Sequence, residues 1–555
     1  MTQIKHRSEI TLVNMIRKFF LYINTIRYLK PIQIYGRIYS KIKSKVPKNY
    51  SAPKKLTPNL NFKTDFIQHD PWNNRNAILN GEFCFLNKRK YLSFPPKWNP
   101  EADLLWKFNL HYFHYLFLLN TDEKEKIIID WIEKNPIGIG TSWHPYVISL
   151  RLVNWIREDF QNHAIIQSIY IQAEYLFRNL EFYHPANHYL ENARALIFAG
   201  IAFNESREGK RWLQKGKEIY YKELPRQVLE DDCYFEKSPM YHNIILHGLL
   251  DLLNILNEED EFYLFIKDYA EKMLQFANIL SFSNGNIPLF NDSTHEIAAS
   301  INSLNNYYSR ICHSNEFAIS SIRQFAKLSS SGYFICKKNE VELIADFGCL
   351  GPDLILAHAH ADIFTYELYY KGLPFIIDTG VYEYKNGEMR DFCRSTKAHN
   401  TISIDGKDQA EIWGGFRIGK RYQPDNVELT ETDSKKILSG EFMGWSKLIG
   451  DNLIHKRVFE TAANYVKVID EVNGKGKHLL ESFIHLHPDV EIKADSSKIE
   501  LKNGNEVLEL EIVNGKYSIE TGFFFPEFGK KIENKVIRLY SNRVPCKFQN
   551  SFKII

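Results

Sequence analysis

Apolar residues between positions 104 and 280 recur at three- and four-residue spacing, in segments separated by short polar or Pro- and Gly-containing breaks. This is the period of amphipathic helices, so the sequence predicts a succession of antiparallel helices joined by short loops. From about residue 330 the period becomes two, in runs such as VELIADFG and YVKVIDEV with frequent Gly, Asn and Asp between them. This alternation predicts an antiparallel all-β half.

Helices followed by strands predict two segregated domains rather than a doubly wound sheet, so the expected fold class is α+β and multidomain. The length of 555 residues is ample for this, since a domain usually takes about 100–200 residues. We expect a basic helical arm over residues 1–60, a helical domain over 61–325 and a β domain over 326–555. Two short strand-like pieces, at 83–87 and 89–94, precede the first long helix.

The net charge of +3 conceals an uneven distribution. Residues 1–55 hold 13 Lys and Arg and one acid, Glu9, so this segment carries +12 and the remainder of the chain −9. Its Leu, Ile, Phe and Tyr residues alternate with the cations at roughly helical spacing, which is typical of an amphipathic helix on an anionic membrane or an acidic polymer. The alternative is a pair of helices docked on the main body with a solvated basic face.

Several function classes are disfavoured by composition. The overall charge is not that of a polycation, and no nucleic-acid-binding motif accompanies the basic residues, so a nucleic-acid partner is not expected. Seven scattered cysteines without a C-x-x-C pair argue against a disulfide framework. Neither a signal-peptide pattern nor an apolar run of about 18 residues is visible. We therefore expect a cytoplasmic protein or one peripheral at the inner membrane, and a periplasmic location less.

Three polar motifs in the β half carry candidate chemistry: AHAHAD at 357–362, PFIIDTG at 374–380 and RSTKAHNT at 394–401. Two imidazoles and one carboxylate from these motifs form a plausible three-ligand zinc set: His360, Asp378 and His399. Their long separation in sequence is weak support, and spacing alone favours a hydrogen-bonded His/Asp network between strands.

Two further motifs lie at predicted helix starts in the helical half. HPANHYLENARALIFAG places Asn187 and His188 just before an apolar helix, and FEKSPMYH places Tyr241 near the start of another. Taken separately, Asn187 or a neighbour is explained as a helix cap and Tyr241 as a core ring with a satisfied hydroxyl.

Together these motifs resemble the heparinase II/III family of polysaccharide lyases, from about residue 105 through the β half. The matching patterns are N-H-Y-L-E-N-A, S-P-M-Y-H, H-A-H-A-D, P-x-I-x-D-T-G-x-Y-x-Y and R-S-T-x-x-H-N-T. The resemblance implies an incomplete (α/α) toroid followed by an antiparallel β-sandwich domain. It also implies an acidic, uronic-acid-containing polysaccharide as the partner, cleaved by β-elimination.

The resemblance assigns roles to three catalytic residues. Asn187 would neutralise the uronate carboxylate, Tyr241 would act as acid and also as base, and His358 would be the base for the other C5 epimer. A tyrosine base needs a depressed pKa, which a cationic neighbour can provide. By the same resemblance His360, Asp378 and His399 would hold a mainly structural Zn²⁺.

Six residues are expected to contact the sugar, although core packing explains Trp143 equally well. They are His188, Trp143, Tyr146, Arg151, Asn154 and Arg394. Arg side chains suit bidentate contacts with carboxylate or sulfate.

Two other functions fit the same motifs. A uronyl C5-epimerase abstracts the same proton without expelling O4, and a non-catalytic glycan-binding factor in polysaccharide assembly would use the same groove without turnover. The basic arm and the lack of a visible signal peptide resemble family versions associated with bacterial capsule or exopolysaccharide production.

Overall fold

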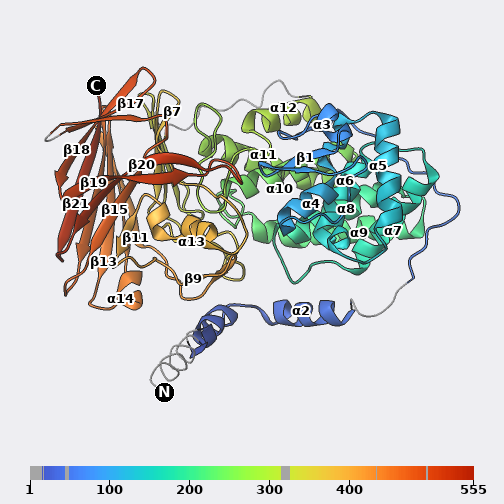
Figure 1. Ribbon diagram of the computed structural model, residues 1–555, viewed down its shortest axis with the longest axis horizontal. Helices are drawn as coiled ribbons and strands as arrows, with labels where there is room; N and C mark the ends of the chain where they lie inside the picture. Colours follow the sequence, from blue (N-terminus) through green and yellow to red (C-terminus); the bar gives the residue numbers. More distant parts are fainter. Residues whose placement is uncertain (1–14, 17, 44–48, 314–324, 433, 496–497) are drawn as a thin grey trace.

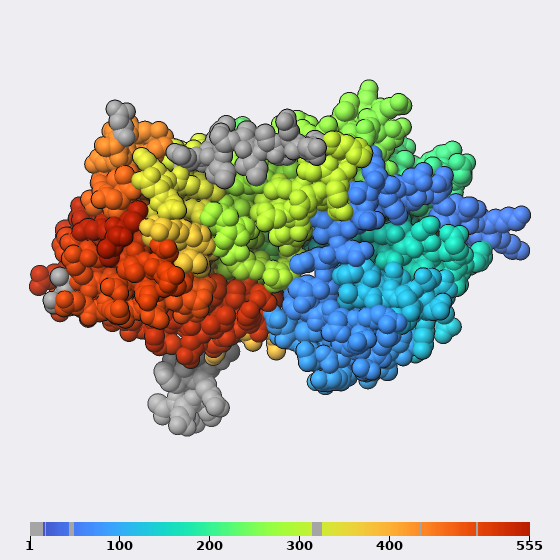
Figure 2. All heavy atoms as spheres, turned by 90° about the horizontal axis from the view of Figure 1, so that it is seen from above, coloured from blue at the N-terminus to red at the C-terminus, as the bar shows by residue number. Residues whose placement is uncertain are grey.

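The chain forms two lobes with an arm beside them, as the computed structural model in Figure 1 shows. Helices fill one lobe and strands the other, and Figure 2 shows the two lobes in contact across the middle of the molecule. The α+β multidomain fold expected from the change of period is confirmed. The structure describes residues 15–16, 18–43, 49–313, 325–432, 434–495 and 498–555.

The helical lobe is a toroid of antiparallel helices preceded by a small hairpin of β1 (Glu82–Phe85) and β2 (Lys88–Tyr91). The hairpin corresponds to the two strand-like pieces expected near residues 83–94. The helices are α3 (Arg75–Leu79), α4 (Leu104–Tyr112), α5 (Thr121–Lys134), α6 (Pro145–Ile156), α7 (His163–Arg178), α8 (Asn187–Ala202), α9 (Arg207–Gln227), α10 (Pro239–Ile255), α11 (Glu261–Leu280) and α12 (Ile301–Cys312).

Helices α8 and α10 form the inside of the toroid. Thirteen of the 16 residues of α8 and 15 of the 17 of α10 are buried, whereas α9 and α11 keep a polar face toward solvent. A helix that is buried on all sides must lie within the lobe, so its polar side chains either bond to other buried groups or face an internal cleft. Gly216 of α9 lets these layers approach, because a Cβ there would lie 2.8 Å from the Ala193 carbonyl oxygen.

Within the described residues, the β lobe contains three larger antiparallel sheets around one apolar core and a further two-stranded hairpin. The eight-stranded sheet has the order β11-β12-β13-β14-β21-β18-β17-β16, the four-stranded sheet β19-β20-β15-β8 and the five-stranded sheet β3-β4-β5-β6-β7. Core residues from different sheets meet in this cluster, among them Leu343, Phe459, Leu539 and Phe552. The expected β-sandwich is therefore confirmed.

The strands of the three larger sheets are between three and ten residues long, and the longest is β20 of the four-stranded sheet. Those of the five- and four-stranded sheets are β3 (Phe325–Lys327), β4 (Tyr333–Lys338), β5 (Val341–Asp346), β6 (Tyr366–Tyr370), β7 (Leu373–Ile376), β8 (Ile402–Ile404), β15 (Leu480–His485), β19 (Lys516–Phe524) and β20 (Ile532–Ser541). Those of the eight-stranded sheet are β11 (Asp425–Glu431), β12 (Lys435–Phe442), β13 (Ile454–Ala462), β14 (Tyr465–Asn473), β16 (Glu491–Ala494), β17 (Lys498–Asn503), β18 (Glu506–Asn514) and β21 (Cys546–Ile554).

Irregular segments of the β lobe face the toroid. They carry the hairpin of β9 (Ile412–Trp413) and β10 (Arg417–Ile418) and the short helix α13 (Glu388–Arg394), while α14 (Gly444–Leu448) lies at the far side. Among the described residues, the last toroid helix ends at Cys312 and the first strand of the β lobe begins at Phe325.

The basic arm lies along the outside of both lobes. Residues 18–26 are helical, and α2 (Pro31–Lys43) follows as a separate rod below the toroid in Figure 1. The arm is docked through side chains, as Gln33 Nε2 donates to the Leu354 carbonyl oxygen of the β lobe (3.1 Å) and Ser40 Oγ lies 3.3 Å from the Tyr183 hydroxyl of the toroid. Residues 1–14 and 44–48 of the expected arm lie outside the described residues. Among the described helices, none combines the length and apolar character that crossing a bilayer requires.

Candidate active site

A cleft of about 1820 Å³ lies between the lobes. Helices α6, α8 and α10 form the toroid side, and loops around residues 354–358 and 382–386 form the β side. The arm contributes a further part of the wall. All three residues expected to be catalytic, Asn187, Tyr241 and His358, line this cleft although they are far apart in sequence.

Tyr241 lies in the first turn of α10, which Ser238 caps by accepting a hydrogen bond from the Tyr241 backbone N–H. Its ring stacks on His358 with 3.9 Å between ring centroids, and its hydroxyl lies 3.2 Å from that of Tyr384. Burial raises the pKa of Tyr241 well above its usual value. Tyr241 is therefore held as a protonated phenol, which suits the acid role and lacks the depressed pKa that a base role would need.

His358 is oriented by a carboxylate on the toroid side. Its Nδ1 lies 2.8 Å from Asp292 Oδ2, and its Nε2 lies 3.9 Å from Glu236 Oε1. Burial alone would raise the pKa of Asp292, but the Arg390 guanidinium holds it well below its usual value. Because the ionised Asp292 can only accept, the proton of neutral His358 is placed on Nδ1, which leaves the Nε2 lone pair free.

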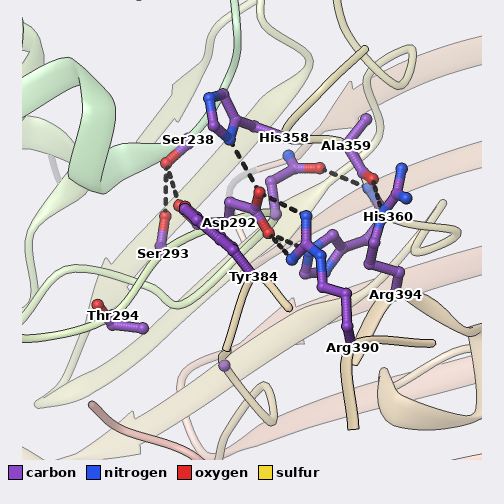
Figure 3. A network of polar contacts seen from close by, with 12 residues as sticks. Ser238, Asp292, Ser293, Thr294, His358, Ala359, His360, Tyr384, Arg390 and Arg394 are labelled. Atoms are coloured by element: carbon purple, nitrogen blue, oxygen red, sulfur yellow. Dashed lines mark hydrogen bonds and ion pairs between the residues drawn. The ribbon is translucent and has the colours of Figure 1, made fainter. Parts of the chain in front are cut away.

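Asp292 connects this histidine with a second one, as Figure 3 shows. Its Oδ1 lies 2.8 Å from His360 Nε2, and Arg390 binds both carboxylate oxygens, with Nη2 to Oδ2 at 2.8 Å. Asp292 and Arg390 are fully buried. One carboxylate thus fixes the orientation of both His358 and His360.

Asn187 is the first residue of α8, and the N-cap position is Ala186, which provides no side-chain hydrogen bond to the helix. Within the described part of the chain, the Asn187 side chain has no hydrogen-bond partner, although the residue is 5% exposed. Free N–H groups and the positive end of a helix dipole attract anions. The start of α8 is therefore a ready position for a carboxylate in the cleft.

His188 stacks on Tyr146 with 4.0 Å between ring centroids, and its Nδ1 lies 3.1 Å from Glu181 Oε1. Burial alone would lower the pKa of His188, but the Glu181 carboxylate raises it. Burial would likewise raise the pKa of Glu181, yet the neighbouring imidazoles lower it to about 2. The raised pKa favours the protonated imidazole, whose Nε2–H stays available as a hydrogen-bond donor while the Glu181 carboxylate balances its charge.

The Glu181–His188 pair makes stability depend on pH. Because the His188 pKa is raised on folding, it adds to the free energy of unfolding. This contribution is complete below about pH 6.5 and is lost as the pH rises through the folded-state pKa. The lowered Glu181 pKa also contributes to the free energy of unfolding, and this contribution is present above about pH 4.3 and is lost as the pH falls toward 2. We expect the difference in Tm between the natural chain and Glu181→Gln to be largest at about pH 5–6 and to shrink by pH 8. Scanning calorimetry measures it, with exposed Glu259→Gln as control, and a pH-independent difference would contradict it.

Three buried polar atoms of the β lobe have no hydrogen-bond partner among the residues that the structure describes: His360 Nδ1, Asp362 Oδ2 and His399 Nε2. These three residues offer ligand atoms within 4.8 Å of one another. Two imidazole nitrogens and a carboxylate oxygen are a donor set that suits zinc. Burying three such atoms without partners is costly, so the residues fit a bound cation.

Asp378 does not belong to this group of ligand atoms, contrary to the expected set. Its Oδ2 lies 2.8 Å from His399 Nδ1 and accepts a hydrogen bond from Thr365 Oγ1 at 3.2 Å. Asp378 therefore orients the histidine, as carboxylates behind metal-bound imidazoles do, and Asp362 takes its place in the group.

The six expected sugar contacts divide into two groups. His188, Tyr146 and Asn154 line the cleft. The prediction is wrong for the other three, which are buried away from it. Trp143 Nε1 donates to the Asn135 carbonyl oxygen, Arg151 to Gln172 Oε1, and Arg394 to the carbonyl oxygens of Ala359 and Gly414. Their hydrogen bonds stabilise the interior of each lobe.

Four cleft or support residues were not singled out from the sequence. Glu236, Tyr384 and Asp362 lie inside the motifs described from the sequence, and their polar side chains in these motifs are the signal that could have identified them. Neither oxygen of Glu236 has a hydrogen-bond partner among the described residues, and burial raises its pKa. Asp292, in the segment PLFNDST, lies in no motif and shows no periodicity.

Comparisons with known proteins agree with this arrangement. The family model described as "Heparinase II/III N-terminus" matches residues 128–318, and "Heparinase II/III-like, C-terminal" matches 322–551. A heparin-sulfate lyase from Bacteroides stercoris is 26% identical over 502 residues, covering 76% of this chain and 71% of the relative. One from Pedobacter heparinus is 25% identical over 423 residues, covering 68% and 59%.

Solved structures show the same fold. The structure titled "Crystal Structure of Heparinase III" superimposes with a TM-score of 0.67 at 18% identity, covering 83% of this chain and 79% of that one. A heparan sulfate lyase from Pedobacter heparinus gives 0.59 at 20% identity, covering 94% and 87%. The similarity to the two lyases, together with the fold, identifies a polysaccharide lyase of the toroid-and-sandwich class. With both family models matched over most of its length, the chain belongs to the heparinase II/III family.

Proposed function

We propose that this lyase cleaves a uronic-acid-containing glycan of the glycosaminoglycan or exopolysaccharide kind by β-elimination. The observation that carries the proposal is the cleft in which the uncapped start of α8, with Asn187, accompanies the Tyr241–His358 pair. The two relatives named above are called heparin-sulfate lyases, which supports an acidic glycan as substrate.

The first task in β-elimination is to make the C5 proton of the uronate acidic although the adjacent carboxylate is negative. Hydrogen-bond donors fixed in a dry site stabilise the charge that develops on that carboxylate. The unpartnered Asn187 amide, the first N–H groups of α8 and the His188 imidazolium supply such donors. We assign carboxylate neutralisation to Asn187, with His188 beside it.

The second task is proton transfer on either side of the C4–O4 bond. His358 Nε2 removes the C5 proton, the electron pair forms the C4–C5 double bond, and the C4–O4 bond breaks. Tyr241, held protonated by burial, donates its phenolic proton to the departing O4. The imidazolium formed on His358 faces Glu236 at 3.9 Å, and its positive charge offsets the effect of burial on the Glu236 pKa and so favours the ionised carboxylate.

Product analysis tests the proposal. Incubation with a panel of uronic-acid polymers is expected to give chain shortening and an unsaturated uronate that absorbs in the near ultraviolet. Deuterium uptake at C5 from heavy water without shortening would instead establish a uronyl C5-epimerase. Affinity for a glycan that persists in Tyr241→Phe, with no turnover by the natural chain, would establish a non-catalytic binding factor.

We propose further that His360, Asp362 and His399 hold a Zn²⁺ ion. Such an ion would supply a fixed positive charge that keeps these three side chains in place. One of them, His360, contacts the same carboxylate, Asp292, that orients His358. Elimination needs no activated water, so every proton transfer described above stays with the residues of this chain.

Metal analysis of the purified protein is expected to find about one zinc per chain, consistent with one donor set of this kind. Asp362→Asn is expected to lose the metal, whereas Asp378→Asn, which acts through His399, is expected to weaken binding by about 10–100-fold. Metal retained in Asp362→Asn and absent from Asp378→Asn would restore Asp378 as the ligand. An unchanged Tm in the presence of a chelator would indicate a hydrogen-bonded network instead.

A further inference from the structure

The arm, residues 15–16 and 18–43, exposes apolar side chains to solvent, whereas a helix packed on a water-soluble body usually buries its apolar side. Of the 24 large hydrophobic residues exposed in the described part of the chain, 13 belong to it. They are Met15, Ile16, Phe19, Phe20, Tyr22, Ile23, Ile26, Ile32, Ile34, Tyr35, Ile38, Tyr39 and Ile42. An apolar surface of this density marks an interaction site rather than ordinary exposed surface.

The side of the arm that packs on the protein is polar or small. Asn24 Nδ2 donates to Glu411 Oε2 at 3.0 Å, and Gln33 Nε2 to the Leu354 carbonyl oxygen at 3.1 Å. Gly36 lies so close to the toroid that a Cβ would meet the Tyr183 side chain at 2.5 Å. The buried positions thus fix the arm in place. Tyr22 also packs edge-to-face on Trp413 of the β lobe, with 4.8 Å between ring centroids, so the surface left for another partner consists of the other twelve exposed apolar residues.

The charge of the arm distinguishes between two possible partners, a second copy of the chain and a membrane surface. Its described residues contain six cations, Lys18, Arg27, Lys30, Arg37, Lys41 and Lys43, and no Asp or Glu. Arg37 and Lys43 are directed inward, to the cleft and to the Arg178 carbonyl oxygen. A second copy docked through the apolar face would bring the remaining cations of the two arms together, with no acid on either arm to offset them. An anionic bilayer surface accepts both features, because apolar side chains enter the headgroup and acyl boundary while Lys and Arg contact the lipid charges.

We infer that the arm binds the surface of an anionic membrane, with residues 18–26 and α2 lying in the interface plane. The inner side of the arm lines the cleft through Thr25, Leu29, Gln33 and Arg37. The cleft therefore lies within about one helix diameter, ~10–12 Å, of the bilayer. This surface binding is independent of the reaction proposed for the cleft.

Co-sedimentation of the full chain with vesicles tests the inference without any measurement of activity. We expect the protein to pellet with phosphatidylcholine–phosphatidylglycerol vesicles, and at least about tenfold less with phosphatidylcholine alone or in high salt. The variant Phe19→Ser/Phe20→Ser/Ile38→Ser is expected to lose at least about tenfold in binding. The matched control Ile139→Ser/Tyr221→Ser/Leu264→Ser removes three equally exposed apolar groups of the toroid and is expected to bind as the natural chain does.

A second variant tests the contribution of charge while leaving the buried side chains unchanged. Lys18→Glu/Lys30→Glu changes only exposed side chains and is expected to abolish the preference for phosphatidylglycerol while leaving Tm unchanged. Absence of pelleting with both vesicle types would overturn the inference. So would equal loss of binding in the control variant, or a lipid-free dimer that the triple arm variant converts to a monomer without altering vesicle binding, which would identify a second copy as the partner.

Discussion

Replacing Tyr241 by Phe is expected to lower kcat by about 10³-fold while leaving KM nearly unchanged. The ring of Phe keeps the 3.9 Å stacking on His358 and the packing at the start of α10, so only the phenolic proton is lost. Positioned proton transfers contribute about 10²–10⁴-fold, and Tyr241 provides the proton for the leaving O4. Initial rates of near-ultraviolet product formation measure the effect.

Tyr221→Phe is the matched control, because Tyr221 lies on the outer helix α9 and is 45% exposed. It is expected to retain natural rates. A Tyr241→Phe enzyme with more than about one tenth of the natural kcat would transfer the acid role to the neighbouring hydroxyl of Tyr384, which lies 3.2 Å away. Equal damage to kcat in both variants would point to a disturbance of the fold.

Asp292→Asn is expected to damage stability and catalysis together. The substitution leaves the fully buried Arg390 guanidinium without its counter-charge, which typically costs about 3–5 kcal/mol. It also removes the acceptor that holds the Nδ1 proton of His358, so kcat is expected to fall by about 10²–10⁴-fold. Urea unfolding and initial rates measure the two effects separately.

Two further variants separate these effects. Asp489→Asn alters a carboxylate whose side chain is 76% exposed, and neither quantity is expected to change. Asp292→Asn/Arg390→Gln removes both charges and is expected to regain part of the lost stability but not the activity. A double variant no more stable than the single one would contradict the account based on an uncompensated charge.

The two-lobed fold was predictable because each of its two hydrophobic periods is sustained over many residues, from 104 to 280 and from about 330 onward. Helices with an apolar stripe and strands with alternating burial, such as β13 and β14, must each bury one face. Of the cleft, Asn187, Tyr241 and His358 were found because they lie in short motifs with recognisable neighbours.

The supporting residues were not predictable in the same way. Asp292 acts on His358 from 66 positions earlier in the chain, and the contact exists only because an irregular segment after α11 reaches the β lobe. Arg151 and Trp143 were misassigned because a polar or aromatic residue in an apolar helix has the same sequence signature whether it faces a cleft or a buried partner. The hydrogen bond from Arg151 to Gln172 in the folded structure shows that Arg151 faces a buried partner and not the cleft.

The docking of the arm has a consequence for how a polymer reaches the cleft. One wall of the cleft belongs to a segment held by a few side-chain contacts, while the other walls belong to the two lobes. Because this wall is separate from both lobes, the shape of the cleft depends on how the arm is docked as well as on the contact between the lobes. A surface that binds the arm would lie beside one wall of the cleft, so the route of a glycan to the cleft would depend on where the enzyme resides.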